Sequence, residues 1–168
     1  LANTFGNLVK RTVSMTNMYF GGTAEDKGVR EEVDDSLKSA VCAARDNAAA
    51  AMDKFCVADA LDAVWAIFRR ANKYIDETTP WILAGQPDKK ERLSTVLYNL
   101  CEAIAVGAAL MKPFMPDTAA EALNEIGAEE RGWDSLDKFG VQKTYRVSAQ
   151  PKTLFARIKF ADIAPEIE

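Results

Sequence analysis

The 168-residue sequence contains no histidine. This absence excludes histidine acid–base catalysis, Ser–His and Cys–His nucleophile pairs, and zinc sites with histidine ligands. Cysteine is scarce: Cys42, Cys56 and Cys101 form an odd set without a close pair. Their apolar, helix-like surroundings predict reduced thiols in the core, and therefore a cytoplasmic protein.

Long hydrophobic runs are also missing. The longest covers residues 103–111, well short of the ~20 residues that a membrane-spanning helix needs. No charged and then apolar leader opens the chain, so we expect no membrane partner. The sequence starts at Leu1 in helical register, without an initiator methionine, and we therefore expect a piece of a longer polypeptide.

Positive charge is not in excess, because 21 Lys and Arg residues oppose 25 Asp and Glu residues. The net charge of −4 excludes a uniformly basic coat of the kind that binds DNA. The bases are nevertheless grouped: residues 1–22 contain Lys10 and Arg11 and no acid, and residues 64–75 contain Arg69, Arg70 and Lys73 and no acid. A polyanion could therefore bind one face of the molecule.

Apolar residues recur at helical spacing through most of the chain. The pattern predicts helices over residues 1–20, 29–55, 61–79, 88–111 and 116–126. Asp88 and Glu91 have capping-box spacing, and Pro80 and Gly127 mark helix ends. The predicted fold is all-α, an antiparallel bundle of about five helices over residues 1–128. Residues 129–168 lose the helical period and predict an irregular tail compatible with short strands.

Two groups of polar and aromatic residues are candidates for ligand binding. Asn7 and Arg11 lie one turn apart on one helix face, with Asn3 one turn before them. An amide and a guanidinium together can read the edge of an unstacked base, and Trp81, in the connection after Pro80, could stack on that base. The alternatives are a solvated face without a ligand and a tryptophan that plugs the end of the bundle.

Catalytic and metal sites are not predicted. The acidic residues Glu31, Glu32, Asp34 and Asp35 are interpreted as a solvated face, because carboxylate-bridged metal bundles usually add histidine ligands. Neither a G-x-G-x-x-G motif nor a phosphate-binding loop occurs, so we expect no cofactor in this chain.

Several stretches resemble the anticodon-binding domain of bacterial methionyl-tRNA synthetase. They are Gly-Asn-Leu-Val-Lys-Arg-Thr-Val at 6–13, Tyr-Phe-Gly-Gly at 19–22, Ala-Asn-Lys-Tyr-Ile-Asp-Glu-Thr-Thr-Pro-Trp at 71–81, and Leu-Met-Lys-Pro-Phe-Met-Pro at 110–116. Leu-Phe-Ala-Arg-Ile at 154–158 is similar to the closing segment of that family, which usually has proline in place of Ala156.

The resemblance implies a tRNA-recognition domain that follows a catalytic domain on the same polypeptide. The catalytic motifs of the family, including the Lys-Met-Ser-Lys-Ser loop, do not occur in this sequence. The chain alone is therefore expected to be inactive, whereas the complete methionine–tRNA ligase would use ATP and Mg²⁺. The tail, residues 129–168, is expected to dock toward that catalytic domain.

The resemblance also implies which residues contact the anticodon loop of methionine tRNA. Asn7, Arg11 and Trp81 match the family positions that engage the anticodon, particularly its first base, cytosine. Lys10, Arg69, Arg70 and Lys73 are candidate phosphate contacts. Two alternatives stay open: the related module of an isoleucine, valine, leucine or cysteine synthetase, and a protein-interaction module with a dimer face on the Ala-rich second and Leu-rich fourth helices.

Overall fold

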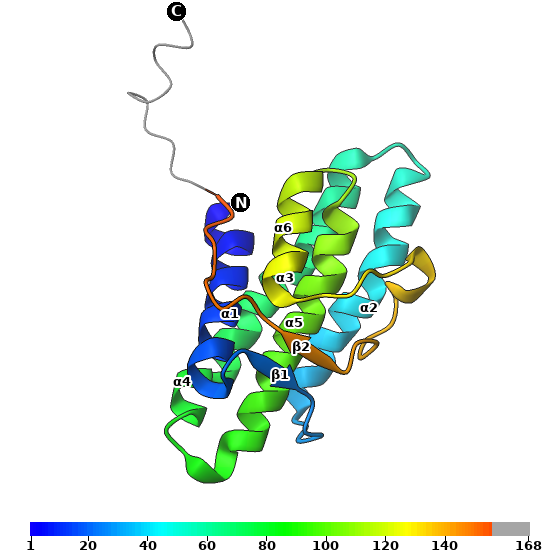
Figure 1. The fold of residues 1–168 in the computed structure, drawn as a ribbon. Coiled ribbons are helices and arrows are strands. Elements are labelled where there is room, and N and C mark those ends of the chain that lie inside the picture. The colour runs from blue at the N-terminus through cyan, green and yellow to red at the C-terminus, as the bar shows by residue number, and fades with distance from the viewer. Residues whose placement is uncertain (156–168) are drawn as a thin grey trace, which may run out of the picture.

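Six α-helices and two short strands make up the part of the chain that the structure, a computed structural model, describes, residues 1–155 (Figure 1). The predicted antiparallel helical bundle is confirmed. The elements in chain order are a π turn at Ala2–Gly6, α1 (Asn7–Phe20), β1 (Thr23–Glu25), α2 (Glu32–Met52), α3 (Val57–Thr78), α4 (Pro80–Leu83), a 3₁₀ turn at Pro87–Lys89, α5 (Lys90–Met111), α6 (Pro116–Ile126), a 3₁₀ turn at Trp133–Ser135 and β2 (Thr144–Arg146).

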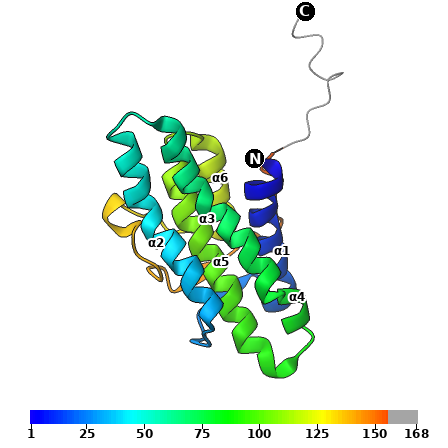
Figure 2. The same ribbon diagram turned by 180° about the vertical axis from the view of Figure 1, so that it is seen from behind.

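Helix α5 is the central element of the bundle. It packs against α1, α2, α3 and α6, and Figures 1 and 2 show it between α1 and α2, with α3 running across one of its faces. The helical segment Pro87–Met111 is long and apolar enough to cross a membrane, but 94% of its most apolar stretch is buried inside the molecule. This helix therefore forms the core of the bundle, and the Leu-rich dimer face considered from the sequence is not on the surface.

The helix ends follow mainly from proline and glycine, as predicted. Pro80 and Pro116 occupy first helical positions, where a missing N–H has no consequence. Gly127 ends α6 with a φ of 63°, and a Cβ at this position would lie 2.1 Å from the carbonyl oxygen of Arg146. Only glycine allows the chain from β2 to pass so close to the end of α6.

Three predicted local features are wrong. Trp81 does not lie in an irregular connection, because α4 begins at Pro80 and includes it. The capping box at Asp88 is not formed, since a 3₁₀ turn precedes α5, which begins at Lys90. The second helix begins at Glu32 and not at the predicted residue 29. The backbone N–H of Glu31, just before it, donates to the carboxylate of Asp34 at 3.2 Å.

The described part of the tail packs on the bundle. Strand β2 pairs antiparallel with β1 in the register Thr23–Arg146, Ala24–Tyr145 and Glu25–Thr144. The buried carboxylate of Glu102 on α5 accepts hydrogen bonds from the Tyr145 hydroxyl, from Arg131 and from the backbone N–H of Gly140, the last at 2.7 Å. Ala156, Arg157 and Ile158 of the closing motif lie outside the described residues.

Two predictions about burial need correction. Cys101 is buried and Cys42 is half-buried, but Cys56 is exposed just before α3, so it is not a core thiol. All three thiols are free. Asp34 does not belong to a solvated acidic face, because its side chain is completely buried and ion-paired.

Candidate nucleic-acid interface

Arg11 and Trp81 come together on the surface of the bundle. The guanidinium carbon of Arg11 lies 5.9 Å from the centroid of the Trp81 ring, within the range of a cation–π contact. Trp81 is 47% exposed and the Arg11 side chain 41% exposed. The indole is therefore not a plug of the bundle end, and both groups are open to a ligand from solvent.

The local chain geometry explains how Trp81 reaches α1. Helix α3 ends at Thr78, and Thr79 adopts a left-handed conformation with a φ of 42°. This turn lets Pro80 start α4 in a new direction, with the proline buried and the following tryptophan outside. The indole is thereby held by backbone geometry rather than by a flexible loop.

Asn7 is the first residue of α1 and is exposed. It precedes Arg11 by one helical turn, so the two side chains lie on the same face, as the spacing predicts. The structure thus places the amide and the guanidinium on one ridge of α1, and the guanidinium next to the indole of α4.

Asp76 is a neighbour of Arg11 that sequence reasoning missed. Its carboxylate Oδ1 lies 3.9 Å from an Nη atom of Arg11, and its side chain is 71% exposed. An exposed pair at this distance contributes little stability, but it can orient the guanidinium. The only sequence signal is the position of Asp76 inside the motif that ends at Trp81.

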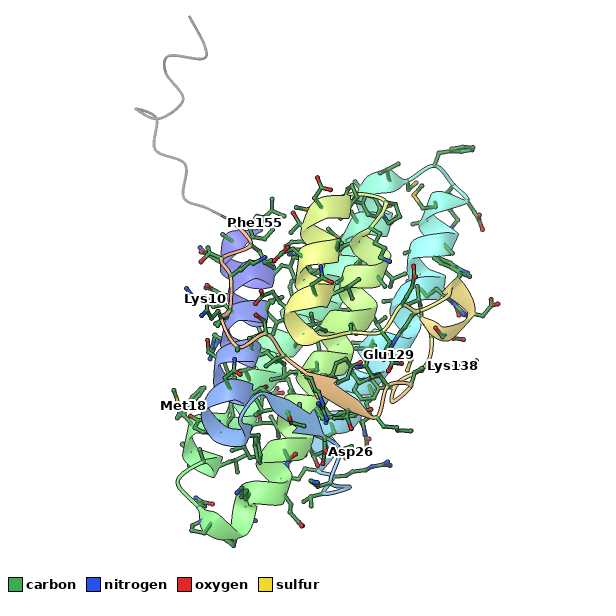
Figure 3. The ribbon with its side chains drawn as sticks, in the orientation of Figure 1. Lys10, Met18, Asp26, Glu129, Lys138 and Phe155 are labelled. Atoms are coloured by element: carbon green, nitrogen blue, oxygen red, sulfur yellow. The ribbon has the colours of Figure 1, made fainter. Side chains whose placement is uncertain are left out.

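The candidate phosphate contacts differ in their availability. Lys10 is exposed, and Figure 3 shows it on the outward side of α1. Lys73 is 72% exposed and 3.6 Å from Glu77. Arg69 makes two hydrogen bonds to the carboxylate of Asp62, at 2.8 and 3.1 Å.

Arg70 is the least available of these bases. Its side chain is only 17% exposed and lies 2.8 Å from Glu77. Its Nε also donates to the hydroxyl of Ser36 at 3.0 Å. Arg70 therefore joins α2 to α3, and a phosphate would have to displace existing partners.

A buried polar network lies in the core between α2, α3 and α5. Arg92 donates to both carboxylate oxygens of Asp34, at 2.7 and 2.8 Å. The Tyr74 hydroxyl donates to the same carboxylate at 2.6 Å and accepts from Asn99 at 3.0 Å. Because Tyr74 lies one turn before Thr78, this network fixes the end of α3 from which α4 and Trp81 extend.

Burial and hydrogen bonding act in opposite directions on the pKa of Asp34. Burial raises the pKa of this carboxyl, but hydrogen bonds from Arg92 and Tyr74 outweigh burial and hold the pKa below its usual range. Burial raises the pKa of the Tyr74 hydroxyl, which therefore stays protonated and donates to Asp34. The network is thus an ion pair completed by neutral donors.

Within residues 1–155, no group of three or more histidine, cysteine, aspartate or glutamate side chains could hold a metal ion. Asn7, Arg11 and Trp81 are all accessible to solvent, and the guanidinium of Arg11 lies beside the indole of Trp81. They can stack on a planar group and offer hydrogen bonds to its edge.

Comparison with known proteins gives one consistent result. The family model of the anticodon binding domain of methionyl tRNA ligase matches residues 24–165. The chain is 39% identical over 168 residues to the methionine–tRNA ligase of Clostridium tetani, spanning 100% of this chain and 26% of that protein. It is 42% identical over 169 residues to the methionine–tRNA ligase of Lactococcus lactis, spanning 99% and 25%.

A solved structure shows the same architecture. Methionyl-tRNA synthetase of Mycobacterium tuberculosis in complex with methionyl-adenylate superposes with a TM-score of 0.84 and 28% identity, over 94% of this chain and 31% of that one. The chain thus spans about a quarter of the length of the curated relatives it matches. Since the family match covers most of the chain, the chain belongs to the family of anticodon binding domains of methionyl tRNA ligase.

Proposed function

We propose that the chain binds the anticodon loop of methionine tRNA through Asn7, Arg11 and Trp81. The observation that carries this proposal is the contact of 5.9 Å between the Arg11 guanidinium and the half-exposed Trp81 ring. A base that stacks on the indole would have its edge close to the guanidinium. The family to which the chain belongs supports the choice of ligand.

The three side chains have two different tasks in this proposal. Stacking on an aromatic ring is worth ~1–3 kcal/mol per base and tolerates every base, so Trp81 supplies affinity without much selectivity. Arg11 and Asn7 supply selectivity, because the guanidinium can donate to the carbonyl oxygen and the ring nitrogen of cytosine. The ring nitrogen of uracil carries a proton and would oppose the same donor.

The longer polypeptide of this family would perform the chemistry. We assign the use of ATP and Mg²⁺, and the aminoacylation of methionine tRNA, to a catalytic domain on the same polypeptide in the cytoplasm. One solved relative carries methionyl-adenylate, the activated amino acid, which is consistent with this division. The C-terminal segment, residues 129–168, would dock toward that catalytic domain.

Binding of two anticodon stem-loops tests the proposal. One loop has cytosine and the other uracil as the first anticodon base, and the titrations compare the unchanged chain with Arg11→Ala. We expect Arg11→Ala to weaken binding of the cytosine loop by about 1.5–3 kcal/mol, the range for a hydrogen bond to a charged group, and binding of the uracil loop by less. Equal losses for both loops would reduce Arg11 to general phosphate attraction.

A matched control separates recognition from charge. Lys10→Ala also removes one positive charge, from the exposed residue that directly precedes Arg11 in α1. This control is expected to lower the affinity of both loops by the same factor. If the unchanged chain binds neither stem-loop, the proposed function itself is wrong.

A further inference from the structure

The side chain of Asn72 joins the first turn of the N-terminal helix to α3. Its Nδ2 atom donates to the backbone carbonyl of Thr4 at 3.1 Å and to that of Phe68 at 2.8 Å. A primary amide has two hydrogens on this nitrogen, and both are used. One side chain thus links the helix that carries Asn7 and Arg11 to the helix that leads to Trp81.

The turn that Asn72 holds has an unusual geometry. Residues Ala2–Gly6 form a π turn, in which the N–H of Gly6 reaches back to the carbonyl of Leu1 at 3.3 Å. Such wide turns are rare and occur often at functional sites. Asn7 is the first residue after this turn, so the direction of its side chain depends on how the turn is fixed.

Apolar contacts surround the same junction. The rings of Phe5 and Phe68 stack with centroids 4.3 Å apart. The ring of Phe155 lies against the first turn of the N-terminal helix, where a Cβ at Gly6 would lie 2.9 Å from it (Figure 3). These contacts set the distance between the segments, but apolar packing has no direction of its own. The hydrogen bond from Asn72 to Thr4 is directional, so it can fix the position of the N-terminal helix along its axis and its rotation about that axis relative to α3.

Asn72 and Asp76 lie one turn apart on α3, and both face the N-terminal helix. Asn72 contacts the turn that precedes Asn7, and Asp76 lies 3.9 Å from Arg11. One face of α3 therefore meets the candidate anticodon ridge at two points. The contact at Asn72 is half-buried and the contact at Asp76 is exposed, so the first is the better constraint on geometry.

We propose that Asn72 is a positioning residue, which sets α1 against α3 so that Asn7 and Arg11 face the nucleotide stacked on Trp81. This inference rests on the proposed anticodon binding. It assigns to Asn72 no contact with RNA. Its loss should therefore reduce the discrimination between bases, and not only the stability of the fold.

Substitutions at Asn72 separate the effect of its N–H donor from the effect of its side-chain shape. Asn72→Asp keeps the shape but points carboxylate oxygens at two carbonyls, and Asn72→Ala removes both hydrogen bonds without adding charge. We expect Asn72→Asp to lower affinity for the cytosine-first stem-loop about tenfold and for the uracil-first loop less. Asn72→Ala should lower the ratio of the two affinities in the same direction, by a smaller factor.

The matched control is Asn47→Asp, on the exposed face of α2 at the opposite side of the bundle from α1 (Figure 1). It adds the same negative charge, so it should weaken binding of both loops alike and leave the ratio of the two affinities unchanged. Circular dichroism checks folding, and Asn72→Ala decides the question if the aspartate variant does not fold. An unchanged ratio in a folded Asn72 variant overturns the inference.

A double substitution tests whether Asn72 acts through Arg11. In the Arg11→Ala background, Asn72→Ala should change the ratio of affinities by a smaller factor than in the unchanged chain, because Asn7 is then the only one of the two positioned groups that remains. A further loss equal to that in the unchanged chain would show that Asn72 acts independently and contradict a positioning role. If Arg11→Ala itself leaves the ratio unchanged, the base-reading role that the proposed function gives to Arg11 fails together with this inference. If only the Asn72 variants leave it unchanged, the proposed function stands and this inference falls.

Discussion

Arg92 and Arg11 place the same chemical group in two opposite regions of the molecule. In the core, Arg92 is 2% exposed and its guanidinium binds both oxygens of the buried Asp34. On the surface, Arg11 has its carboxylate neighbour at 3.9 Å and an indole ring at 5.9 Å. The guanidinium of Arg92 donates its hydrogen bonds within the core, whereas the guanidinium of Arg11 has N–H groups that are free to donate to a ligand.

The difference teaches how to separate structural from functional charge in this bundle. A buried charge must be paired, because an unpaired one carries a large desolvation penalty. An exposed charge contributes little to stability whether it is paired or not. Substitutions in the core region should therefore change folding, and substitutions in the surface region should change binding at nearly constant stability.

The largest expected effect is in the core. Asp34→Ala removes the buried carboxylate partner of the Arg92 guanidinium and leaves only the exposed Glu31 at 3.4 Å, and we expect a loss of about 3–5 kcal/mol in the free energy of unfolding. Denaturant unfolding followed by circular dichroism measures it. The control is Asp35→Ala, the exposed neighbour, which should change the free energy by less than about 0.5 kcal/mol. Similar small losses in both variants would contradict the assigned role of the pair.

The second effect is on the surface, where a substitution should change binding and leave stability nearly constant. Trp81→Ala should weaken binding of the cytosine-first stem-loop by ~1–3 kcal/mol, the value of one stacked base. Because the indole is half-exposed, the free energy of unfolding should change little compared with Asp34→Ala. Trp133→Ala is a control, since Trp133 is 55% exposed on a different segment. Unchanged binding by folded Trp81→Ala would remove the stacking role.

The third effect is the response of the core to acid. The pKa of Asp34 lies below its usual range in the folded state, so its stabilising contribution is complete above the unfolded-state pKa of about 3.9. That contribution is lost as the pH falls through the folded-state pKa. The difference in unfolding free energy between the unchanged chain and Asp34→Asn should thus shrink below about pH 4. A constant difference down to pH 2 would be inconsistent with an ionised Asp34.

The smallest effect concerns the salt dependence of RNA binding. Each phosphate contact to a single strand adds about 0.7 to the slope of log affinity against log salt. Lys10→Gln should lower that slope by about this amount, because Lys10 is exposed beside Arg11. Arg70→Gln should leave the slope nearly unchanged, since Arg70 is held by Glu77 and Ser36. The reverse result would place the RNA backbone along α2 and α3.

The sequence predicted the features that depend on neighbours along the chain. The spacing of Asn7 and Arg11 gave one exposed face, because the helical repeat puts residues four apart on the same side. Pro80 and Gly127 marked helix ends for equally local reasons.

The tertiary structure alone decided the features that join distant parts of the chain. The helical repeat places Asp34 on the same face of α2 as the buried Leu37, but its partner Arg92 is 58 residues away and is brought to it only by the packing of α5. The exposure of Cys56, the pairing of β1 with β2 and the approach of Arg11 to Trp81 are of the same kind. Local periodicity determines on which face of a helix a side chain lies, whereas the packing of the helices against α5 determines which residues that face contacts.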